Sequence, residues 1–573
     1  MKTPTNISNF LTGVAFFTVC IVFLYTRVET APIHFTHYDD LWPGYVFQVM
    51  ESYSPEKLAE QISTKIGFFG SDGNLRLEQL FRDYPLIFSI TKVLVTPFAI
   101  ASSSTYAPFQ FIFSKLFYDF SSSYEFSKFS LRLPSLVYSF LSIFLIYKIS
   151  NRLNINEKSL FRVSGALILT LSWMFLIYSS QGQTYASVVF GPLVLFYLLQ
   201  TQRTYSEFLR KNLLYGGIVS LLVTMNYQLA FLLPAFFISL LFGSNKTLYS
   251  FNKDWWLSLV ITLCTSVLIY ITFLKDRLAQ STPGVNWNAG DKEQYLINLN
   301  CGENSVSCAL NFFIENFSHV MQSILSFDNI DSLTSQLYSY SLTILFLLGI
   351  YYLFKTSRSS LALFAIGSVF SIALFIIFGY LSYSPTRHMM IILPIMAFVS
   401  PFGLLFLIDL INKKILRNIY FFLAIFAPLV FYSSSFQEQL DKRVDPLQEI
   451  EFSKLIEKYS PGHIVAYNFT LASEFFPIIK NNYDSKYYGA SDEDFIHYQK
   501  KSNSNKIFIL CLNYESCSSR KDEVIKIIHK KFFKDLKLTE VEKIIIDKNT
   551  TNCFGDLAGS GTNKLFFWIY EFN

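Results

Sequence analysis

Eleven stretches of the chain are long enough and apolar enough to cross a membrane as helices. A spanning helix needs about 20 mostly apolar residues, and somewhat fewer when it is packed in a bundle. A chain with so many runs is expected to fold as a polytopic α-helical membrane protein. The predicted spans are about 9–26, 132–149, 163–179, 185–200, 213–225, 227–243, 256–274, 338–354, 361–382, 388–411 and 418–432.

The composition supports the same fold class. Of the 573 residues, 51% are hydrophobic and only 16% are charged, and the mean hydropathy is +0.34. Ordinary soluble domains carry about 25% charged residues. A soluble enzyme, a disordered protein and a nucleic-acid binder are therefore excluded, and no nucleic-acid partner is expected in spite of the formal charge of +5.

Lys and Arg in the short loops predict the orientation. Cytoplasmic loops carry an excess of these residues. With the N-terminus in the cytoplasm, every short basic loop falls on the cytoplasmic face. These loops contain Lys148, Arg152, Lys158 and Arg162; Arg203, Arg210 and Lys211; Lys246 and Lys253; Lys355 and Arg358; and Lys413, Lys414 and Arg417.

The apolar stretch 84–101 tests this scheme, because a single crossing there would move Lys148 and Arg152 to the outside. It must lie along the outer surface or cross and return with 107–118, and Lys92 and Pro97 favour an interfacial helix.

The first span resembles a signal peptide but lacks a small-residue cleavage site, so we expect it to be retained.

The predicted organisation has two domains. Residues 1–432 form the transmembrane domain, with one large outer loop over 27–131 and a second over 275–337. Residues 433–573 are rich in Lys, Asp, Glu, Asn and Ser, and are expected to form an extracytoplasmic α/β domain. Strands are predicted at His463–Phe469, Lys506–Leu512, Lys543–Ile546 and Leu565–Tyr570, and helices at Leu471–Asn481 and Lys521–Leu536.

The seven cysteines indicate at most structural disulfides. Cys301 and Cys308 share the second outer loop and are close enough in sequence to pair, and one pair among Cys511, Cys517 and Cys553 is open. No cysteine has zinc-finger spacing with histidines.

Two adjacent carboxylates, Asp39 and Asp40, follow the first span, together with His37. Carboxylates at a membrane boundary are costly unless they are hydrated, paired or bound to a cation. A solvated loop with a helix N-cap explains them equally well.

Further polar residues stand where predicted helices begin on the outer side. Asp83 precedes Tyr84 and Pro85, a common opening of a helix. Arg387 and His388 open the tenth span, and this arginine suits a phosphate or a lipid head group. The others are Glu125 and Arg132 near the second span and Tyr185 at the fourth.

The order of these elements resembles one family. It is the GT-C type of polyprenyl-phosphate-sugar-dependent glycosyltransferases, particularly the protein O-mannosyltransferase (dolichyl-phosphate-mannose-protein mannosyltransferase-like) and aminoarabinose-transferase branch. The resemblance covers about residues 10–410, and its most specific element is Tyr124 to Ser135, YEFSKFSLRLPS. Members commonly have Asp-Glu at Asp39–Asp40, a basic residue or His with two prolines at 83–85, and Arg before the tyrosine of 185.

The resemblance implies a GT-C fold with juxtamembrane helices in the first outer loop, and a sugar transfer on the extracytoplasmic face. It implies that Asp39 is the catalytic base and that Asp40 is its partner or substitute. Donor-phosphate binding is assigned to Arg387, with His388 and Arg132 behind it. The substrate pocket is expected to include His37, Asp83, Glu125 and Tyr185.

The donor is then a polyprenyl-phosphate-linked sugar, used as a co-substrate, and the acceptor is a protein, a lipid or a glycan. A divalent cation, Mg²⁺ or Mn²⁺, held by Asp39, Asp40 and Asp83 is an open alternative, because hard cations prefer oxygen ligands. The expected location is a bacterial inner (plasma) membrane, in contact with membrane lipids. Rival functions are a transporter or flippase for lipid-linked saccharides, and an O-antigen type ligase or polymerase.

Overall fold

The computed structural model of the protein describes most of the predicted helical core and five C-terminal strands. The residues that it describes are 4–30, 53–66, 71–101, 108–118, 124–153, 155–180, 182, 184–201, 218–219, 221–242, 301, 306–325, 332–378, 381, 383, 387–410, 429–430, 432, 436, 446–466, 496–500, 503–511, 525–526, 538–547 and 564–572.

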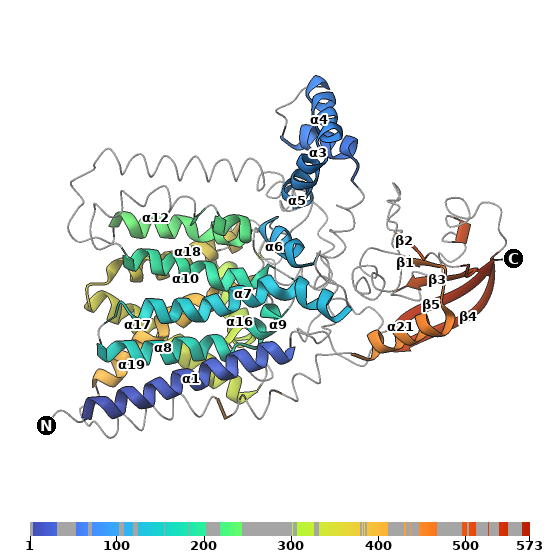
Figure 1. The fold of residues 1–573 in the computed structure, drawn as a ribbon. Helices are drawn as coiled ribbons and strands as arrows, with labels where there is room; N and C mark the ends of the chain where they lie inside the picture. The colour runs from blue at the N-terminus through green and yellow to red at the C-terminus, as the bar shows by residue number, and fades with distance from the viewer. Residues whose placement is uncertain are drawn as a thin grey trace.

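The main body is a bundle of long apolar helices, and Figure 1 shows them lying side by side. Among the described residues, five helical segments are long and apolar enough to cross a membrane, and a bent pair gives a sixth. They are Thr12–Thr30, Phe129–Ser150, Leu333–Lys355, Ser359–Ile377 and Arg387–Leu410, with Lys158–Leu171 and Trp173–Ser179 as the bent pair. The bundle therefore has the helices of a membrane protein.

Most of these helices coincide with predicted spans. The bundle contains α1 (Pro4–Thr30), α7 (Tyr124–Ser150), α8 (Ile155–Leu171), α9 (Trp173–Ser179), α10 (Tyr185–Thr201), η2 (Tyr227–Leu232), α12 (Leu233–Phe242), α16 (Val306–Leu325), α17 (Leu333–Lys355), α18 (Ser359–Ile377), η5 (Arg387–Ile391) and α19 (Ile392–Leu410). Helix α16 was not predicted: it lies in the stretch 275–337 that was expected to be an outer loop, and it packs against α17, α9 and η5. The predicted span 256–274 and most of 213–225 and 418–432 lie outside the described residues, so the count of eleven stays a prediction.

One predicted span needs correction. The stretch 163–179 is not a straight helix, because α8 and α9 meet at Ser172 with a bend of 74°. The Ser172 hydroxyl accepts a hydrogen bond from the Phe175 amide and so starts a new helix. The residues on both sides of Ser172 are apolar because both helices are buried in the bundle. Hydrophobicity alone therefore does not show where the helix breaks.

Helix α19 is the central helix of the bundle, and it touches α17 backbone to backbone. A Cβ atom added to Gly403 would lie 1.9 Å from the Leu345 carbonyl oxygen, and one added to Gly349 would lie 2.2 Å from the Val399 oxygen. Ser400 also donates a hydrogen bond to the Leu342 carbonyl across this crossing. Small residues permit such contacts between membrane helices, where apolar burial gives little driving force.

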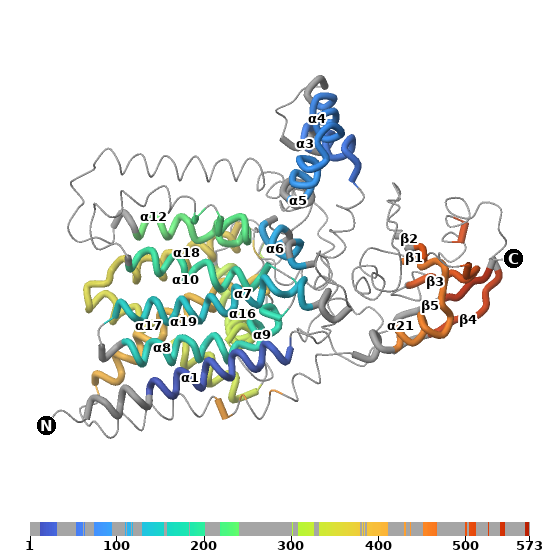
Figure 2. Tube along the Cα trace, in the orientation of Figure 1, coloured from blue at the N-terminus to red at the C-terminus, as the bar shows by residue number. Residues whose placement is uncertain are grey.

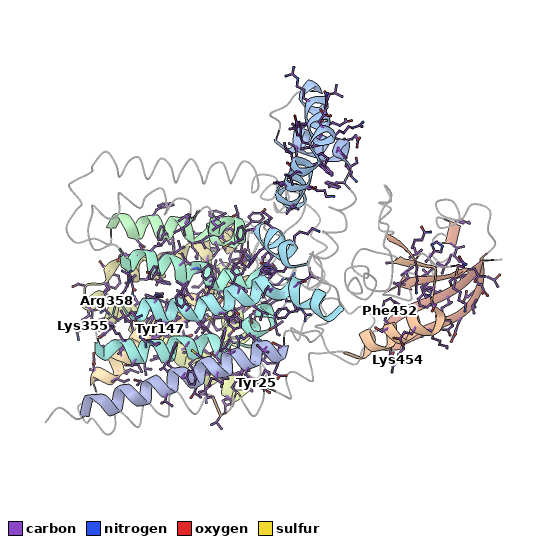
Figure 3. The ribbon with its side chains drawn as sticks, in the orientation of Figure 1. Tyr25, Tyr147, Lys355, Arg358, Phe452 and Lys454 are labelled. Carbon is purple, nitrogen blue, oxygen red and sulfur yellow. A yellow bond between two sulfur atoms is a disulfide. The ribbon has the colours of Figure 1, made fainter. Side chains whose placement is uncertain are left out.

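The basic residues of two helix connections lie at the end of the bundle where the N-terminus also lies. Figure 3 places Tyr147, Lys355 and Arg358 at this end and Tyr25 toward the other. Arg162 stacks on Tyr147 with 4.3 Å between Cζ and the ring centroid, and Arg152 donates to the Tyr197 hydroxyl at 3.1 Å. Cations resting on aromatic rings suit a membrane–water boundary.

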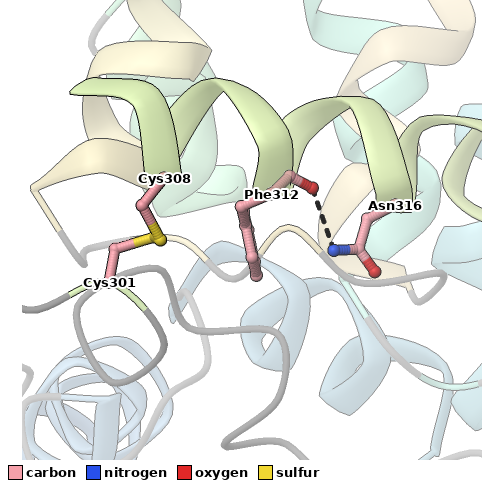
Figure 4. Close-up of a disulfide and its surroundings, with 4 residues drawn as sticks. All are labelled: Cys301, Cys308, Phe312 and Asn316. Carbon is pink, nitrogen blue, oxygen red and sulfur yellow. Dashed lines mark hydrogen bonds between the residues drawn. A yellow bond between two sulfur atoms is a disulfide. The ribbon is translucent and has the colours of Figure 1, made fainter. Parts of the chain in front are cut away.

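A disulfide lies at the opposite end of the bundle. Cys301 and Cys308 form it, as predicted, and Cys308 is in the first turns of α16, where the Asn316 amide donates to the Phe312 carbonyl (Figure 4). Disulfides form in oxidising compartments outside the cytoplasm. The basic loops and the disulfide thus give two independent signals that favour the same orientation.

This orientation has a direct test. In a background without the other thiols, an impermeant maleimide should label Leu333→Cys in intact cells but leave Asn151→Cys unlabelled until the membrane is permeabilised. The two positions lie at opposite ends, since the 23 residues of α17 span about 35 Å. Labelling of Asn151→Cys alone in intact cells would reverse the orientation.

Three helices of the predicted first outer loop form a small unit above the bundle in Figure 1: α3 (Pro55–Ile66), α4 (Ser71–Asp83) and α5 (Pro85–Ala101). Their core contains Leu58, Ile62 and Phe81, while Leu86 and Ile90 of α5 are exposed. Helix α6 (Pro108–Tyr118) connects this unit to α7. The stretch 84–101 is therefore a helix outside the bundle, as one of the two predicted arrangements requires.

The C-terminal strands form one mixed sheet in the order β2-β1-β3-β5-β4. The strands are β1 (His463–Ala466), β2 (Ile496–Gln499), β3 (Lys506–Cys511), β4 (Leu538–Asp547) and β5 (Lys564–Phe572), and α21 (Pro446–Tyr459) precedes them. Four consecutive residues of β3, from Ile507 to Leu510, are buried, which means that both faces of this strand are covered. Figure 2 shows α21 and the sheet apart from the helical bundle.

All four predicted strands are present within the described residues. Strand β2 was not predicted. Its four residues, IHYQ, are mostly polar and too few to give a clear strand pattern. The predicted helix 471–481 lies outside the described residues, as does 521–536 apart from 525–526.

Candidate functional site

The candidate site lies where several irregular helix ends meet around the start of α10. Both α12 and α19 begin with a 3₁₀ turn, η2 and η5, and both turns contact α10. The short helix α9, beyond the Ser172 break, contacts α10 and η5 as well. Irregular backbone at membrane depth is tolerated where protein or a polar cavity satisfies it, so such a convergence marks a functional region.

Three of the predicted site residues come together here. The Arg387 guanidinium carbon lies 5.2 Å from the centroid of the Tyr185 ring. The His388 ring meets the same tyrosine edge-on, with centroids 5.9 Å apart. Tyr185 therefore lies against two of the three residues that the resemblance assigns to donor-phosphate binding, Arg387 and His388.

A glutamine that the sequence did not suggest fixes the histidine. The Gln228 amide nitrogen lies 3.3 Å from His388 Nδ1. The Gln228 side chain thereby holds the imidazole ring of His388, and which of the two groups donates depends on the tautomer of the histidine. Arg387 supplies positive charge beside this imidazole, since both residues contact Tyr185.

Asn226 holds this arrangement in place at the turn before η2. Its side-chain oxygen accepts a hydrogen bond from the backbone amide of Gln228 at 2.9 Å. Its side-chain nitrogen donates to the Thr184 hydroxyl at 3.2 Å and to the Thr184 carbonyl at 3.3 Å. The start of α10 and the start of η2 are thereby joined beside His388. Asn226 falls in the gap between the predicted spans 213–225 and 227–243, and Gln228 falls inside the second of them, so neither was predicted as a site residue.

Aromatic side chains enclose the cluster. Tyr178 of α9 is fully buried and its ring lies 5.1 Å from that of Tyr185. Tyr383, four residues before Arg387 in the sequence, packs on Phe313 of α16 with ring centroids 5.0 Å apart. Burial raises the pKa of the Tyr383 phenol above its ordinary value.

Arg132 is placed at the same end of the bundle but on another helix. It is fully buried near the start of α7, where Gln110 and Ser114 of α6 pack against Ser135 and Leu131. Helices α7 and α10 lie against each other, and the rings of Tyr138 and Phe190, 5.9 Å apart, form part of their contact. Arg132 is thus a buried cation near this end of the bundle, and its part in phosphate binding stays a prediction.

The remaining predicted residues are not tested or lie elsewhere. Asp83 is exposed at the end of α4, in the unit that Figure 1 shows apart from α10. Glu125 is in the first turn of α7, but its side chain lies outside the described residues, as do His37, Asp39 and Asp40. Among the residues that the structure describes, no group of three His, Cys, Asp or Glu could hold a metal ion.

Comparisons with family models, curated proteins and solved structures gave no match to this chain. The function is therefore inferred from the residues themselves.

Proposed function

We propose that the protein is a membrane glycosyltransferase that moves a sugar from a polyprenyl-phosphate donor to an acceptor on the extracytoplasmic face. The single observation that supports this most is the convergence of Arg387, His388 and Tyr185 at the bundle end opposite the basic loops. Their residue types suit a phosphate ester held beside an aromatic ring. The order of motifs between residues 10 and 410 adds the resemblance to the GT-C type of enzyme.

In the proposed reaction the acceptor hydroxyl or amine attacks the anomeric carbon of the sugar. Its proton passes to the Asp39 carboxylate, which serves as the general base. The bond between the anomeric carbon and the phosphate oxygen breaks, and its electron pair leaves with the polyprenyl phosphate. Direct displacement from the opposite face inverts the anomeric centre.

Arg387 stabilises the charge that develops on the leaving phosphate, and His388 donates a second hydrogen bond. Donors fixed in place before reaction are more effective than water, because they do not reorganise as the charge forms. Arginine is suited to this role since its guanidinium can bind two phosphate oxygens at once.

Replacing Arg387 by alanine should lower kcat/KM for the donor by about 10- to 100-fold, because hydrogen bonds to charged groups contribute about 1.5–3 kcal/mol. Arg387→Lys should recover part of the loss. The matched control is Arg358→Ala, which removes a cation stacked on Phe402 at the other end of the bundle. Steady-state rates at varied donor concentration measure all three variants, and an unchanged donor dependence in Arg387→Ala would remove this residue from the phosphate site.

A transporter or flippase for lipid-linked saccharides is the second candidate function. The observation that favours it is the 74° break between α8 and α9, since broken helices at membrane depth are common in transporters. A transporter would move the intact lipid-linked sugar across the membrane. It would leave the bond between sugar and phosphate unbroken, which separates it from the proposed enzyme.

A further inference from the structure

We propose that Arg27 is a positioning residue that, together with Thr30, clasps the short helix α9 to the end of α1. The proposal rests on the proposed function in one respect. Helix α9 contacts the candidate site, and the chain leads from the end of α1 to the proposed base Asp39. The clasp itself is a statement about the structure and can be tested without any sugar transfer.

Arg27 is fully buried in the last turn of α1, and it lies at the break between α8 and α9. Its terminal nitrogens donate to the carbonyls of Leu169 at 3.3 Å and Thr170 at 3.5 Å. The last carbonyls of an α-helix have no partner within that helix. In an apolar bundle they need another donor, and the arginine fork supplies two at once.

The surroundings keep this guanidinium in one place. Its central carbon lies 3.9 Å from the centroid of the Phe23 ring and 5.4 Å from that of Phe175, so the cation is held between α1 and α9. Thr26 accepts a further hydrogen bond at 3.1 Å, and Tyr432 lies beside Thr26 and Arg27. A fully buried arginine is costly in a membrane bundle unless specific contacts compensate its charge and its hydrogen-bond donors.

The second half of the clasp lies one turn further along α1. The hydroxyl oxygens of Thr30 and Ser180 are 2.6 Å apart, and Ser180 directly follows the last residue of α9. Arg27 therefore holds the carbonyls before α9 and Thr30 holds its end. A seven-residue helix tied at both ends has a fixed direction relative to α1.

Both supports lead to the proposed reaction site. Helix α9 carries Tyr178, whose ring contacts Tyr185 of the Arg387 cluster. In the other direction the chain reaches Asp39 nine residues after Thr30. The clasp thus connects two parts of the proposed site. One is the end of α1, from which the chain continues to the proposed base Asp39, and the other is α9, whose Tyr178 contacts Tyr185.

The test is disulfide trapping between Thr30→Cys and Ser180→Cys in the full-length protein, in a background without its other free thiols. The 2.6 Å separation is close to the 2.05 Å of a disulfide bond, so the pair should cross-link rapidly. Adding Arg27→Gln should lower the cross-linking rate at least fivefold, and Arg27→Lys, with one point-like donor, should give an intermediate rate. The matched control Arg162→Gln removes an arginine bonded to Ser150 and Asn151 at the far end and should change nothing.

Activity adds a second readout. Without the trapping cysteines, Arg27→Gln should lower kcat for sugar transfer at least tenfold with donor KM within twofold, and the oxidised Thr30→Cys/Ser180→Cys tether should restore kcat. The wild type treated with the same oxidant and reductant corrects for effects on Cys301–Cys308. Wild-type cross-linking rates in Arg27→Gln, or in Arg27→Lys if Arg27→Gln does not fold, would overturn the clasp. Slow cross-linking in a protein that transfers no sugar would support the clasp and reject only the proposed function.

Discussion

Gly403→Leu is expected to destabilise the folded bundle strongly. Even the Cβ atom of alanine would lie 1.9 Å from the Leu345 carbonyl oxygen, which belongs to backbone and cannot rotate away. Helices α17 and α19 would have to separate, and α19 is buried along most of its length. Overpacking of a dense core costs about 1–3 kcal/mol and more where backbone must move, so we expect the melting temperature of the purified protein to fall by ~10 °C or more.

The matched control is Gly13→Leu. Gly13 is also a glycine of an apolar spanning helix, α1, but a Cβ added there meets no atom within 4 Å. This variant should keep the wild-type melting temperature and elution profile in detergent. A Gly403→Leu protein as stable as Gly13→Leu would show that α17 and α19 do not touch through their glycines.

Asp39→Asn is expected to abolish sugar transfer while leaving the fold intact. The substitution keeps the shape of the side chain but removes its capacity to take a proton, and general-base catalysis contributes about 10²–10⁴-fold to rates. Turnover of the purified variant should fall by at least ~10²-fold, with the melting temperature of the wild type. Wild-type turnover would show that Asp39 is not the base.

Asp83→Asn is the control for this experiment and also decides the open question of a divalent cation. Asp83 is exposed at the end of α4, so its loss should leave the rate nearly unchanged if Asp39 acts as a base alone. A loss of activity in both variants, together with inactivation by a chelator, would favour a cation held by Asp39, Asp40 and Asp83.

The sequence predicted the parts of the fold that depend on apolar length and charge placement. Helices lie at the predicted spans over most of the residues that the structure describes, the break at Ser172 excepted, and the Cys301–Cys308 pair formed as expected. Lys148, Arg152, Lys355 and Arg358 follow the charge pattern because the boundary between membrane and water sorts cations strongly.

The sequence did not predict the break at Ser172, because a serine between apolar residues usually remains inside a helix. At the break, the carbonyls of Leu169 and Thr170 accept hydrogen bonds from Arg27, which is 142 and 143 residues away from them in the sequence. Gln228 was overlooked for a similar reason, since its partner His388 is distant in sequence. Local periodicity carries no information about such long-range hydrogen bonds.

Within the site, Arg387, His388 and Tyr185 were identified by their positions at the outer starts of predicted spans. Their contact could not be predicted, because it requires α10 and η5 to meet. Asp83 lies at the exposed end of α4, and its part in the site stays a prediction because Asp39 and Asp40 lie outside the described residues.

The most direct test of the account is the fate of the donor in a reconstituted membrane. Purified protein in lipid vesicles is given a polyprenyl-phosphate sugar labelled in both the sugar and the lipid, together with an envelope extract as acceptor source. Free polyprenyl phosphate should appear in step with sugar bound to acceptor, and Asp39→Asn should form neither. Movement of intact donor across the bilayer, with the bond between sugar and phosphate unbroken, would contradict the proposed sugar transfer.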